Sequence, residues 1–352
     1  MFNGTRLDIL FGDPEIGGLF SDEAELAGML AFEVALAGAQ ADAGLIPAAS
    51  AAAIEAACTS YQADPAYLAA GMARDGLVVP ALIEQLRASL AEPHRQWLHV
   101  GATSQDLIDT SLVLRLKSVA GHLDRRLAEL IADLQRLRNT QGALFLMAQT
   151  RMQQALPMTV ADRLETWRLP LERHRERLAE ILPRLLVVQF GGPIGVRGGQ
   201  AGKGEAIAAA LAARLVLGTA HSWLSARDRI VEFAGWLSLV TGAFGKIGQD
   251  VALMAQNEVG AVRVDGGGIS SAMPHKSNPV TAELLVTLAR FNAGLLGTLH
   301  QSLVHENERS GAAWTLEWAV LPQMAVMTGA SLSHAASLLG RLQFLGKKDL
   351  GR

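Results

Sequence analysis

The fold is decided by the stretch Leu116-Lys-Ser-Val-Ala-Gly-His-Leu-Asp-Arg-Arg-Leu-Ala-Glu-Leu-Ile-Ala-Asp-Leu-Gln-Arg-Leu137. Its apolar side chains recur in alternating steps of four and three residues, at Leu116, Ala120, Leu123, Leu127, Leu130, Leu134 and Leu137. This spacing places them along one seam of a helix that packs lengthwise on other helices. Because no proline interrupts the chain there, we predict one long helix from Ser104 to about Met147.

Helical patterns cover most of the remaining chain and predict an all-α protein. They fall at residues 21–43, from 47 onward, 65–72, 80–90, 156–182 (with Pro170 as a kink and Pro183 as a stop), 220–258, 279–307 and 314–342. Alternation typical of a strand is nearly confined to residues 186–190. We therefore predict a small N-terminal helical domain at 1–103, an elongated bundle of long helices at 104–342 and a tail at 343–352.

Composition narrows the class of protein. Half of the residues are apolar and 18% are charged, so we expect apolar surfaces to be buried between subunits. The net charge of -3 gives no basic field that would attract nucleic acid. The single cysteine, Cys58, excludes an intrachain disulfide and fits a reducing compartment. Without a signal-peptide pattern or an uninterrupted apolar run of spanning length, the prediction is a cytoplasmic protein with neither membrane nor nucleic-acid partners.

Three polar stretches interrupt the helices, and the first is His99-Val-Gly-Ala-Thr-Ser-Gln-Asp106. Thr103, Ser104 and Asp106 are typical of a helix cap. The free N–H groups and hydroxyls of a helix start are equally suited to binding a carboxylate. On this stretch alone capping is favoured, although it does not explain His99 and Gly101.

The other two polar stretches differ in how well a plain loop explains them. Gln149-Thr-Arg-Met-Gln-Gln154 has the composition of an ordinary solvated connector between two helices. The third stretch is Asp265-Gly-Gly-Gly-Ile-Ser-Ser-Ala-Met-Pro-His-Lys-Ser-Asn-Pro279. Its glycines indicate a flexible loop, and its hydroxyl, cationic and amide side chains indicate a lid that closes over a ligand.

The third stretch also carries a family resemblance. Ser270-Ser-Ala-Met-Pro-His-Lys-Ser-Asn-Pro279 resembles the signature of the fumarase/aspartase superfamily, and the first two stretches resemble its other two blocks in the same order. Residues 223–233, 242–258 and 308–318 are similar to the cycloisomerase branch of that superfamily. The resemblance covers nearly the whole chain. It implies an elongated helical bundle and a homotetramer whose active sites combine the three stretches from three different subunits.

The chain also departs from the superfamily pattern. Arg151 stands where its lyases usually have a histidine, a residue that bacterial cycloisomerases also lack. Asn307 stands where a histidine is frequent before Glu-Arg. The sequence stops soon after the last long helix, so the expectation is a shortened form in which the usual C-terminal helical domain is missing.

The resemblance implies that the chain acts on a small tricarboxylate, 3-carboxy-cis,cis-muconate, in the protocatechuate branch of the β-ketoadipate pathway. One carboxylate oxygen adds across a C=C bond of the same molecule and gives 4-carboxymuconolactone. The reaction needs a folded substrate, donors for the charge that develops on the neighbouring carboxylate, and a proton for carbon. None of these steps requires a metal or an organic cofactor, and we expect neither.

Residue roles follow from the same resemblance. It assigns proton transfer to Ser270, with Lys276 favouring the alkoxide, and gives His99 a place in substrate binding or proton relay. The substrate-binding residues that it implies are Thr103, Ser104, Thr150, Arg151, Gln153, Ser271, Met273, Asn278 and Arg309. For Arg151 and Arg309, a salt bridge at the surface or at a subunit interface is an equally good explanation.

Three rival interpretations stay open on the sequence. The substrate could instead be a sulfonated analogue of the muconate, because a sulfonate binds to the same cationic and N–H donors as a carboxylate. A β-eliminating lyase such as adenylosuccinate lyase would use the same loop, although Arg151 argues against it. A helical scaffold without activity is disfavoured because Ser270, Lys276 and Asn278 occur together in one loop.

Overall fold

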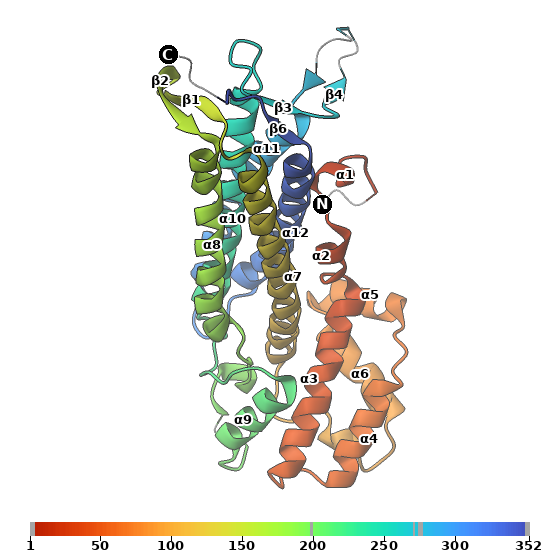
Figure 1. Ribbon diagram of the computed structural model, residues 1–352. Coiled ribbons are helices and arrows are strands. Elements are labelled where there is room, and N and C mark those ends of the chain that lie inside the picture. The colour runs from red at the N-terminus through yellow and green to blue at the C-terminus, as the bar shows by residue number, and fades with distance from the viewer. Residues whose placement is uncertain (1–3, 198–199, 270–271, 274–276, 349–352) are drawn as a thin grey trace.

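A computed structural model describes residues 4–197, 200–269, 272–273 and 277–348. Long helices stand side by side as an elongated bundle, and shorter N-terminal helices pack against its lower part (Figure 1). The bundle consists of α7 (Ser104–Gln141), α8 (Val160–Leu185), α10 (Asp228–Met254), α11 (Val280–His300) and α12 (Gly311–Gly340). This arrangement confirms the predicted all-α fold with an elongated bundle of long helices.

The shorter elements surround the two ends of the bundle. The N-terminal part contains α1 (Asp8–Phe11), α2 (Pro14–Gly18), α3 (Asp22–Asp42), α4 (Ala48–Thr59), α5 (Pro65–Asp75), α6 (Val79–Ser89) and the 3-10 turn η1 (Arg95–Trp97). Further short helices are η2 (Gly192–Ile194), α9 (Gly204–Leu215) and η4 (Gln301–Leu303). Three antiparallel strand pairs are β1 (Phe145–Thr150) with β2 (Gln153–Thr159), β3 (Val262–Val264) with β6 (Leu342–Phe344), and β4 (Gly268–Ile269) with β5 (Ser277–Asn278).

The predicted seam of α7 forms the centre of the bundle core. Leu116, Leu123, Leu127 and Leu134 are fully buried, together with Trp167 of α8 and Trp236 of α10. Burial of each such leucine contributes roughly 1.5–3 kcal/mol relative to exposure. The alternating steps of four and three residues therefore give α7 one continuous apolar face that packs on other helices, as predicted.

Helices α10 and α11 approach each other closely because two glycines on α10 lack side chains. A Cβ on Gly245 would lie 2.5 Å from the Cβ of Ala289, and one on Gly248 would lie 2.4 Å from the carbonyl oxygen of Ala282. Real Cβ atoms essentially never come so near. Any side chain at these two positions would push α11 outward, and with it the loop that precedes α11.

A second core joins the N-terminal helices to the lower end of the bundle. The Ser21 hydroxyl accepts a hydrogen bond from the Ala24 N–H, so this residue caps α3 as the sequence indicates. Phe32 and Leu36 of α3 pack with Ile108 of α7, Trp314 of α12 and residues of α9, a helix that the sequence reading missed. This core draws on both sides of residue 103, and the domain boundary placed there stays a prediction.

The predicted end of the long helix is wrong. α7 ends at Gln141, and the polar connector at 149–154 is the tip of a β-hairpin in which Thr150 pairs with Gln153. The two turn residues, Arg151 and Met152, have φ values of 50° and 64°. A two-residue hairpin of this kind normally carries Asn or Gly at these positions, so the usual sequence signal for the turn is absent.

Other predicted boundaries also need correction. Residues 186–190 form only an isolated parallel bridge, between Val187 and Gly218, rather than a full strand. Pairing does not extend to Gln189, whose N–H and carbonyl both bond Thr110 Oγ1. α8 begins at Val160, after the hairpin, and continues past Pro183 to Leu185, so Pro183 is not a stop. α10 begins at Asp228 rather than at residue 220, and α11 ends at His300 rather than at residue 307.

Within the described residues, three helical stretches are long and apolar enough on average to cross a membrane, whereas the absence of uninterrupted apolar runs in the sequence predicted none. They are Asp22–Asp42, Asp228–Met254 and Val280–Leu303. In Asp228–Met254, 61% of the most apolar 18-residue segment is buried inside the protein. In Val280–Leu303 the buried share of the equivalent segment is only 28%. α11 therefore presents an apolar surface that one chain leaves largely uncovered.

We predict that His174 makes the bundle sensitive to acid. Its side chain is buried on α8, where burial and the nearby Arg177 and Arg173 lower its pKa to about 4. The unfolded chain binds this proton near its ordinary pKa of 6.5, so stability is complete above that value and is lost as the pH falls from about 6.5 to 4. Urea unfolding at several pH values measures the slope.

The matched variant is His174→Gln, which has no titrating ring. It is expected to flatten the stability profile between about pH 6.5 and 4, with little change in the slope against urea. An unchanged acid slope in His174→Gln would show that another group causes the loss.

Candidate active site

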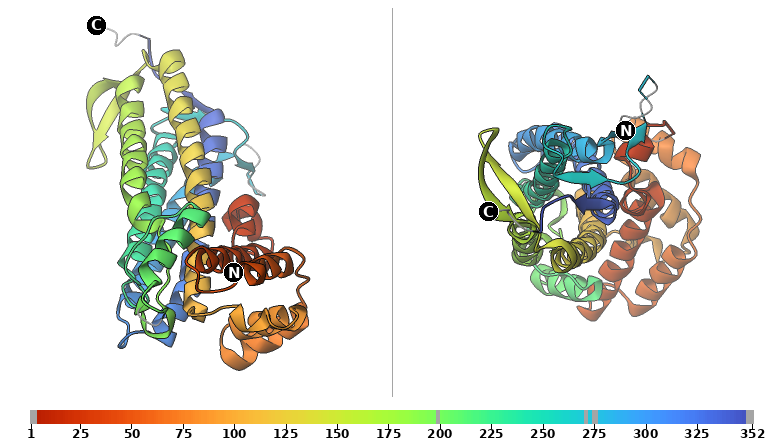
Figure 2. Two further views of the ribbon diagram at one scale, coloured as in Figure 1. Left: turned by 90° about the horizontal axis from the view of Figure 1, so that it is seen from below. Right: turned by 45° about the horizontal axis from the view of Figure 1, so that its top comes forward.

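The length of α7 separates the predicted site residues within one chain. The first polar stretch lies at the start of this 38-residue helix and the second lies just beyond its end, so about 57 Å of helix stands between them. Figure 1 shows β1 and β2 at the opposite end of the bundle from α9, and β4 at the same end as the hairpin. Figure 2, seen from the tilted top, places the hairpin and β4 on different sides of the bundle. One chain thus does not bring the three stretches together.

The first stretch is held in place by two side chains of α3. His99 has a φ of 62°, and its Nδ1 lies 2.6 Å from Oε1 of Glu33. Gln40, on the same face of α3, donates a hydrogen bond of 2.7 Å to the Val100 carbonyl. Sequence reading missed Glu33 and Gln40. The signal available was a pair of polar residues seven positions apart on an otherwise apolar helix.

Asp106 anchors the start of α7 more strongly than a helix cap requires. Its carboxylate accepts hydrogen bonds from the N–H groups of Thr103, Gly191 and Gly192 and from the amide of Gln189. Complete burial nevertheless dominates and raises the pKa of Asp106 to about 6. The capping interpretation therefore holds for Asp106, which ties the head of α7 to the turn at Gly191–Gly192 and faces away from solvent.

Arg309, in the segment between α11 and α12, reaches the same helix start although it is distant in sequence. Its guanidinium donates 3.2 Å to the Thr103 hydroxyl and 3.5 Å to the carbonyl of Pro193. Arg309 is exposed, and Ser104 and Thr103 are half-buried beside it. Two of the predicted carboxylate ligands thus lie together, at a helix N-terminus whose N–H groups favour anions. An interface ion pair is not needed to explain where Arg309 points.

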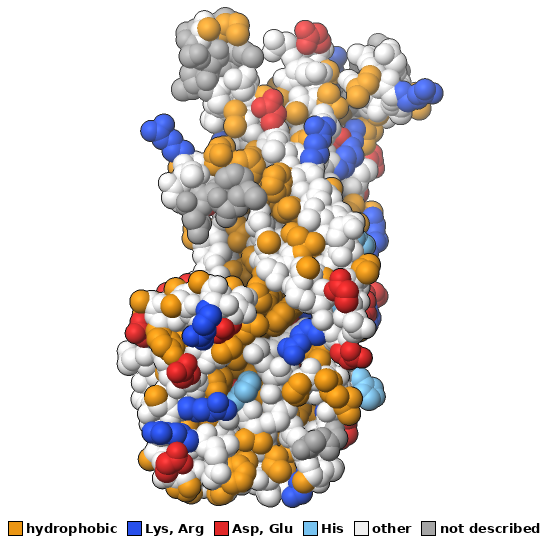
Figure 3. All heavy atoms as spheres, turned by 180° about the vertical axis from the view of Figure 1, so that it is seen from behind, with side chains coloured by type: hydrophobic (Ala, Val, Ile, Leu, Met, Phe, Trp, Pro, Cys, Tyr) orange, Lys and Arg blue, Asp and Glu red, His pale blue; other side chains and the backbone are white. Residues whose placement is uncertain are grey.

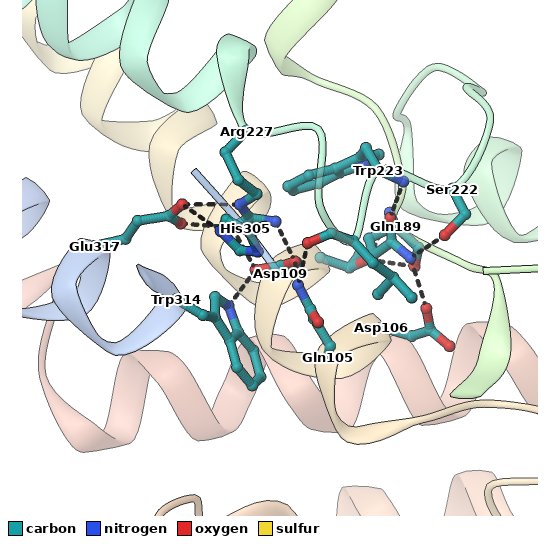
Figure 4. Close-up of polar contacts among 12 residues, drawn as sticks. Gln105, Asp106, Asp109, Gln189, Ser222, Trp223, Arg227, His305, Trp314 and Glu317 are labelled. Atoms are coloured by element: carbon teal, nitrogen blue, oxygen red, sulfur yellow. Dashed lines mark hydrogen bonds and ion pairs between the residues drawn. The ribbon is translucent and has the colours of Figure 1, made fainter. Parts of the chain in front are cut away.

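Beneath this surface lies a buried ionic cluster that joins three helices (Figure 4). The guanidinium of Arg227, in the turn before α10, forms two hydrogen bonds of 2.6 and 3.0 Å with Asp109 of α7. It forms two more, of 2.9 and 2.6 Å, with Glu317 of α12. Asp109 also accepts from the indole N–H of Trp314 and from the amide of Gln105. All three charged side chains are at most 1% exposed.

The electrostatics of the cluster reflect this burial. Burial lowers the pKa of Arg227, but attraction by Asp109 and Glu317 outweighs it and leaves the pKa raised. Burial raises the pKa of Glu317 against the opposing effect of Arg227. His305, whose Nε2 is 4.0 Å from Glu317, has its pKa lowered by burial and by Arg227. The cluster holds the segment between α11 and α12, and thereby Arg309, against α7.

The second stretch presents its polar side chains to solvent. Thr150, Arg151, Met152 and Gln153 are all exposed at the hairpin tip. Beside the tip is an open hollow of about 670 Å³, lined by Gln149, Met152, Gln153, Gln154, Leu253, Gln256, Glu258 and Val259. No chain segment in the described part of the structure covers the tip, so these predicted ligands lack a binding partner within one chain.

The third stretch is described at its two sides and at residues 272–273. Asn278 pairs with Gly268 across the β4–β5 ladder, and Met273 is 43% exposed. Ser270, Ser271 and Lys276 lie outside the described residues. Arg341, at the end of α12, donates to the carbonyls of Asp265 and Gly266 and to the hydroxyl of Thr281, so one guanidinium holds both flanks of the loop. Among the residues that are described, no group of three or more His, Cys, Asp or Glu side chains is placed to hold a metal ion.

Comparisons with known proteins identify the family of this chain. The Lyase family matches residues 12–292. The chain is 42% identical to 3-carboxy-cis,cis-muconate cycloisomerase of Pseudomonas aeruginosa over 347 residues, which cover 96% of this chain and 75% of that protein. This chain belongs to the fumarase/aspartase superfamily of lyases. Its members are enzymes, so the chain is an enzyme by descent.

Solved structures of superfamily members agree with the fold. The 3-carboxy-cis,cis-muconate lactonizing enzyme of Pseudomonas putida superposes with a TM-score of 0.88 at 38% identity, covering 96% of this chain and 77% of that one. A fumarate lyase from Mesorhizobium sp. BNC1 superposes with a TM-score of 0.88 at 33% identity, covering 95% and 76%. Both likenesses show that this chain has the fold of the superfamily.

We predict that the buried cluster depends on its single cation. Arg227→Met removes the cation and leaves two buried carboxylates without a counter-charge, so it should lower the free energy of unfolding by about 3–5 kcal/mol. Glu317→Gln, at the same cluster, keeps a hydrogen-bond acceptor and removes a charge that burial already disfavours. It should cost clearly less, and urea unfolding of both variants measures the order. A loss in Glu317→Gln equal to that in Arg227→Met would contradict this account.

Proposed function

We propose that the chain is a cycloisomerase that converts 3-carboxy-cis,cis-muconate to 4-carboxymuconolactone. The observation that carries the proposal is the 42% identity, over 96% of the chain, with a cycloisomerase of that name. The hairpin tip adds support, because Arg151 occupies the position where lyases of the superfamily usually carry a histidine. A substrate with three carboxylates gains from a cation at this position, because the cation offsets part of the negative charge in the site.

The described residues supply what this chemistry requires at the start of α7. Thr103, Ser104 and Arg309 offer hydroxyls, free N–H groups and a cation to one substrate carboxylate. We propose that Thr150, Arg151 and Gln153 bind a second carboxylate, and that Asn278, Met273 and Ser271 complete the pocket. Ser270, assisted by Lys276, then transfers the proton to carbon. Each of these groups fixes the substrate or stabilises charge, and none needs a bound cofactor.

We further propose that the working enzyme is a homotetramer with shared sites, located in the cytoplasm. The length of α7 supports sharing, because no single chain can place the head of α7 and the hairpin on one small molecule. The poorly covered α11 supports burial between subunits. Figure 3 shows hydrophobic side chains gathered along the bundle and around its junction with the N-terminal helices on the face seen from behind. The proposed cytoplasmic location rests on the single cysteine, which fits a reducing compartment.

A direct assay tests the proposed reaction. Lactonisation of 3-carboxy-cis,cis-muconate is followed by ultraviolet absorbance with the wild type, with Ser270→Ala and with Ser118→Ala, an exposed serine on α7 that serves as control. Ser270→Ala should lose roughly 10²–10⁴-fold in kcat, as expected for a lost proton-transfer group, while the control stays active. Equal rates in wild type and Ser270→Ala would remove the role of Ser270. Elimination from adenylosuccinate without lactonisation would overturn the reaction itself.

Mixing two inactive variants tests the shared site. His99→Asn and Ser270→Ala alter different stretches, so sites in a mixed tetramer that take each stretch from a different subunit are intact in about a quarter of cases. Co-refolding of the two variants should therefore restore measurable activity, and refolding of either alone should not. No recovery in a mixture that reassembles, as judged by light scattering, would place the whole site in one chain.

A further inference from the structure

Glu33 is a buried acid in an apolar setting. It lies in the middle of α3 between Phe32 and Leu36, in the second core, and its side chain is 1% exposed. Its Oε1 contacts His99, and its Oε2 is buried without a hydrogen-bond partner among the described residues. A carboxylate in such a place costs several kcal/mol unless a donor compensates it. The imidazole of His99 is the donor that the structure provides.

The pairing determines which atom of His99 faces outward. An ionised carboxylate can only accept, so with Glu33 charged the contact of 2.6 Å requires the proton on Nδ1. Nε2 is then the atom left for other partners, and the side chain keeps 14% of its surface exposed. The same short stretch leads directly into Thr103, which Arg309 contacts. His99 therefore has Nε2 available, in the same short stretch as the helix start where a substrate carboxylate is proposed to bind.

Two further observations concern the backbone that carries the ring. The backbone of His99 is in the left-handed region, which few residues other than glycine adopt without support. Gln40 holds the next residue through the Val100 carbonyl. α3 thus uses one side chain to hold the backbone of this turn and another to hold the ring.

We propose that Glu33 is a positioning residue for the reaction: it fixes His99 with Nε2 toward the substrate and balances the positive charge when Nε2 carries a proton. This inference rests on the proposed function and adds a residue to its site. Glu33 touches no substrate and acts only through the imidazole. The arrangement follows the general rule that a carboxylate behind a histidine selects its tautomer and stabilises its charged form.

Kinetics of matched variants separate this role from a structural one. Glu33→Gln keeps an acceptor for Nδ1 but removes the charge, and we expect kcat to fall at least about tenfold with a smaller change in KM. Glu33→Asp keeps the charge and should recover part of that loss. Gln40→Leu is the control, since it removes the other α3 anchor of the same turn and leaves the ring contact intact. A loss in Gln40→Leu as large as in Glu33→Gln would make the role structural and overturn the proposal.

A double-variant cycle tests whether Glu33 acts through His99. In a His99→Gln background, Glu33→Gln should cause no further fall in kcat, because the group that it serves is gone. Multiplying losses in the double variant would instead mean that Glu33 acts independently of the imidazole, which overturns the proposal.

A spectroscopic measurement distinguishes failure of this inference from failure of the proposed function. The ¹⁵N resonances of histidine side chains report the tautomer without any substrate, and the His99 signals are identified by their loss in His99→Gln. We expect a protonated Nδ1 in the wild type and in Glu33→Asp, and a mixture of tautomers in Glu33→Gln. An unchanged His99 spectrum in Glu33→Gln overturns the positioning role, whether or not the wild type forms a lactone.

Discussion

The four hydrogen bonds of Arg227 hold together the end of the bundle on which the candidate site depends. One guanidinium bridges Asp109 of α7 and Glu317 of α12, and it stacks on Trp223 at 4.7 Å from the ring centre. Because every partner is buried, water cannot replace a lost contact. The start of α7 and the segment bearing Arg309 therefore keep a fixed relation, which places a cation beside a helix N-terminus without a ligand to order them.

The second constraint is the length of α7, which keeps the first and second polar stretches of one chain far apart. A helix of about 57 Å cannot bring its two ends to one small polyanion. The same length gives the bundle the long apolar seam that makes it stable. The feature that secures the fold therefore also separates the predicted ligands, which is why we propose a site completed between chains, with the exposed apolar surface of α11 as a place for that contact.

Much of the fold was predictable from sequence, because the repeat of four and three residues on α7 leaves one apolar face and few ways to bury it. The hairpin was not predictable, since Arg151 and Met152 adopt left-handed backbones without the Asn or Gly that normally indicate such a turn. Thr103 and Arg309 were singled out by residue type and family resemblance, and the structure places them in contact, while their roles stay a prediction. Glu33, Asp109 and Glu317 were not, because the sequence pattern does not reveal which distant cation or imidazole compensates a buried acid.

The left-handed residues show how the two ends of the site differ. Among the described residues six non-glycine positions have positive φ, including His99, Arg151, Met152 and Asn307, each in or beside a segment that bears predicted ligands. Such a backbone costs about 1–2 kcal/mol per residue and persists only where its surroundings offset the cost. At His99 the offset comes from two buried side chains of α3, whereas at the hairpin tip it comes from strand pairing alone. The α7 end is therefore preformed in a single chain, whereas the hairpin tip has only its own two strands to hold it.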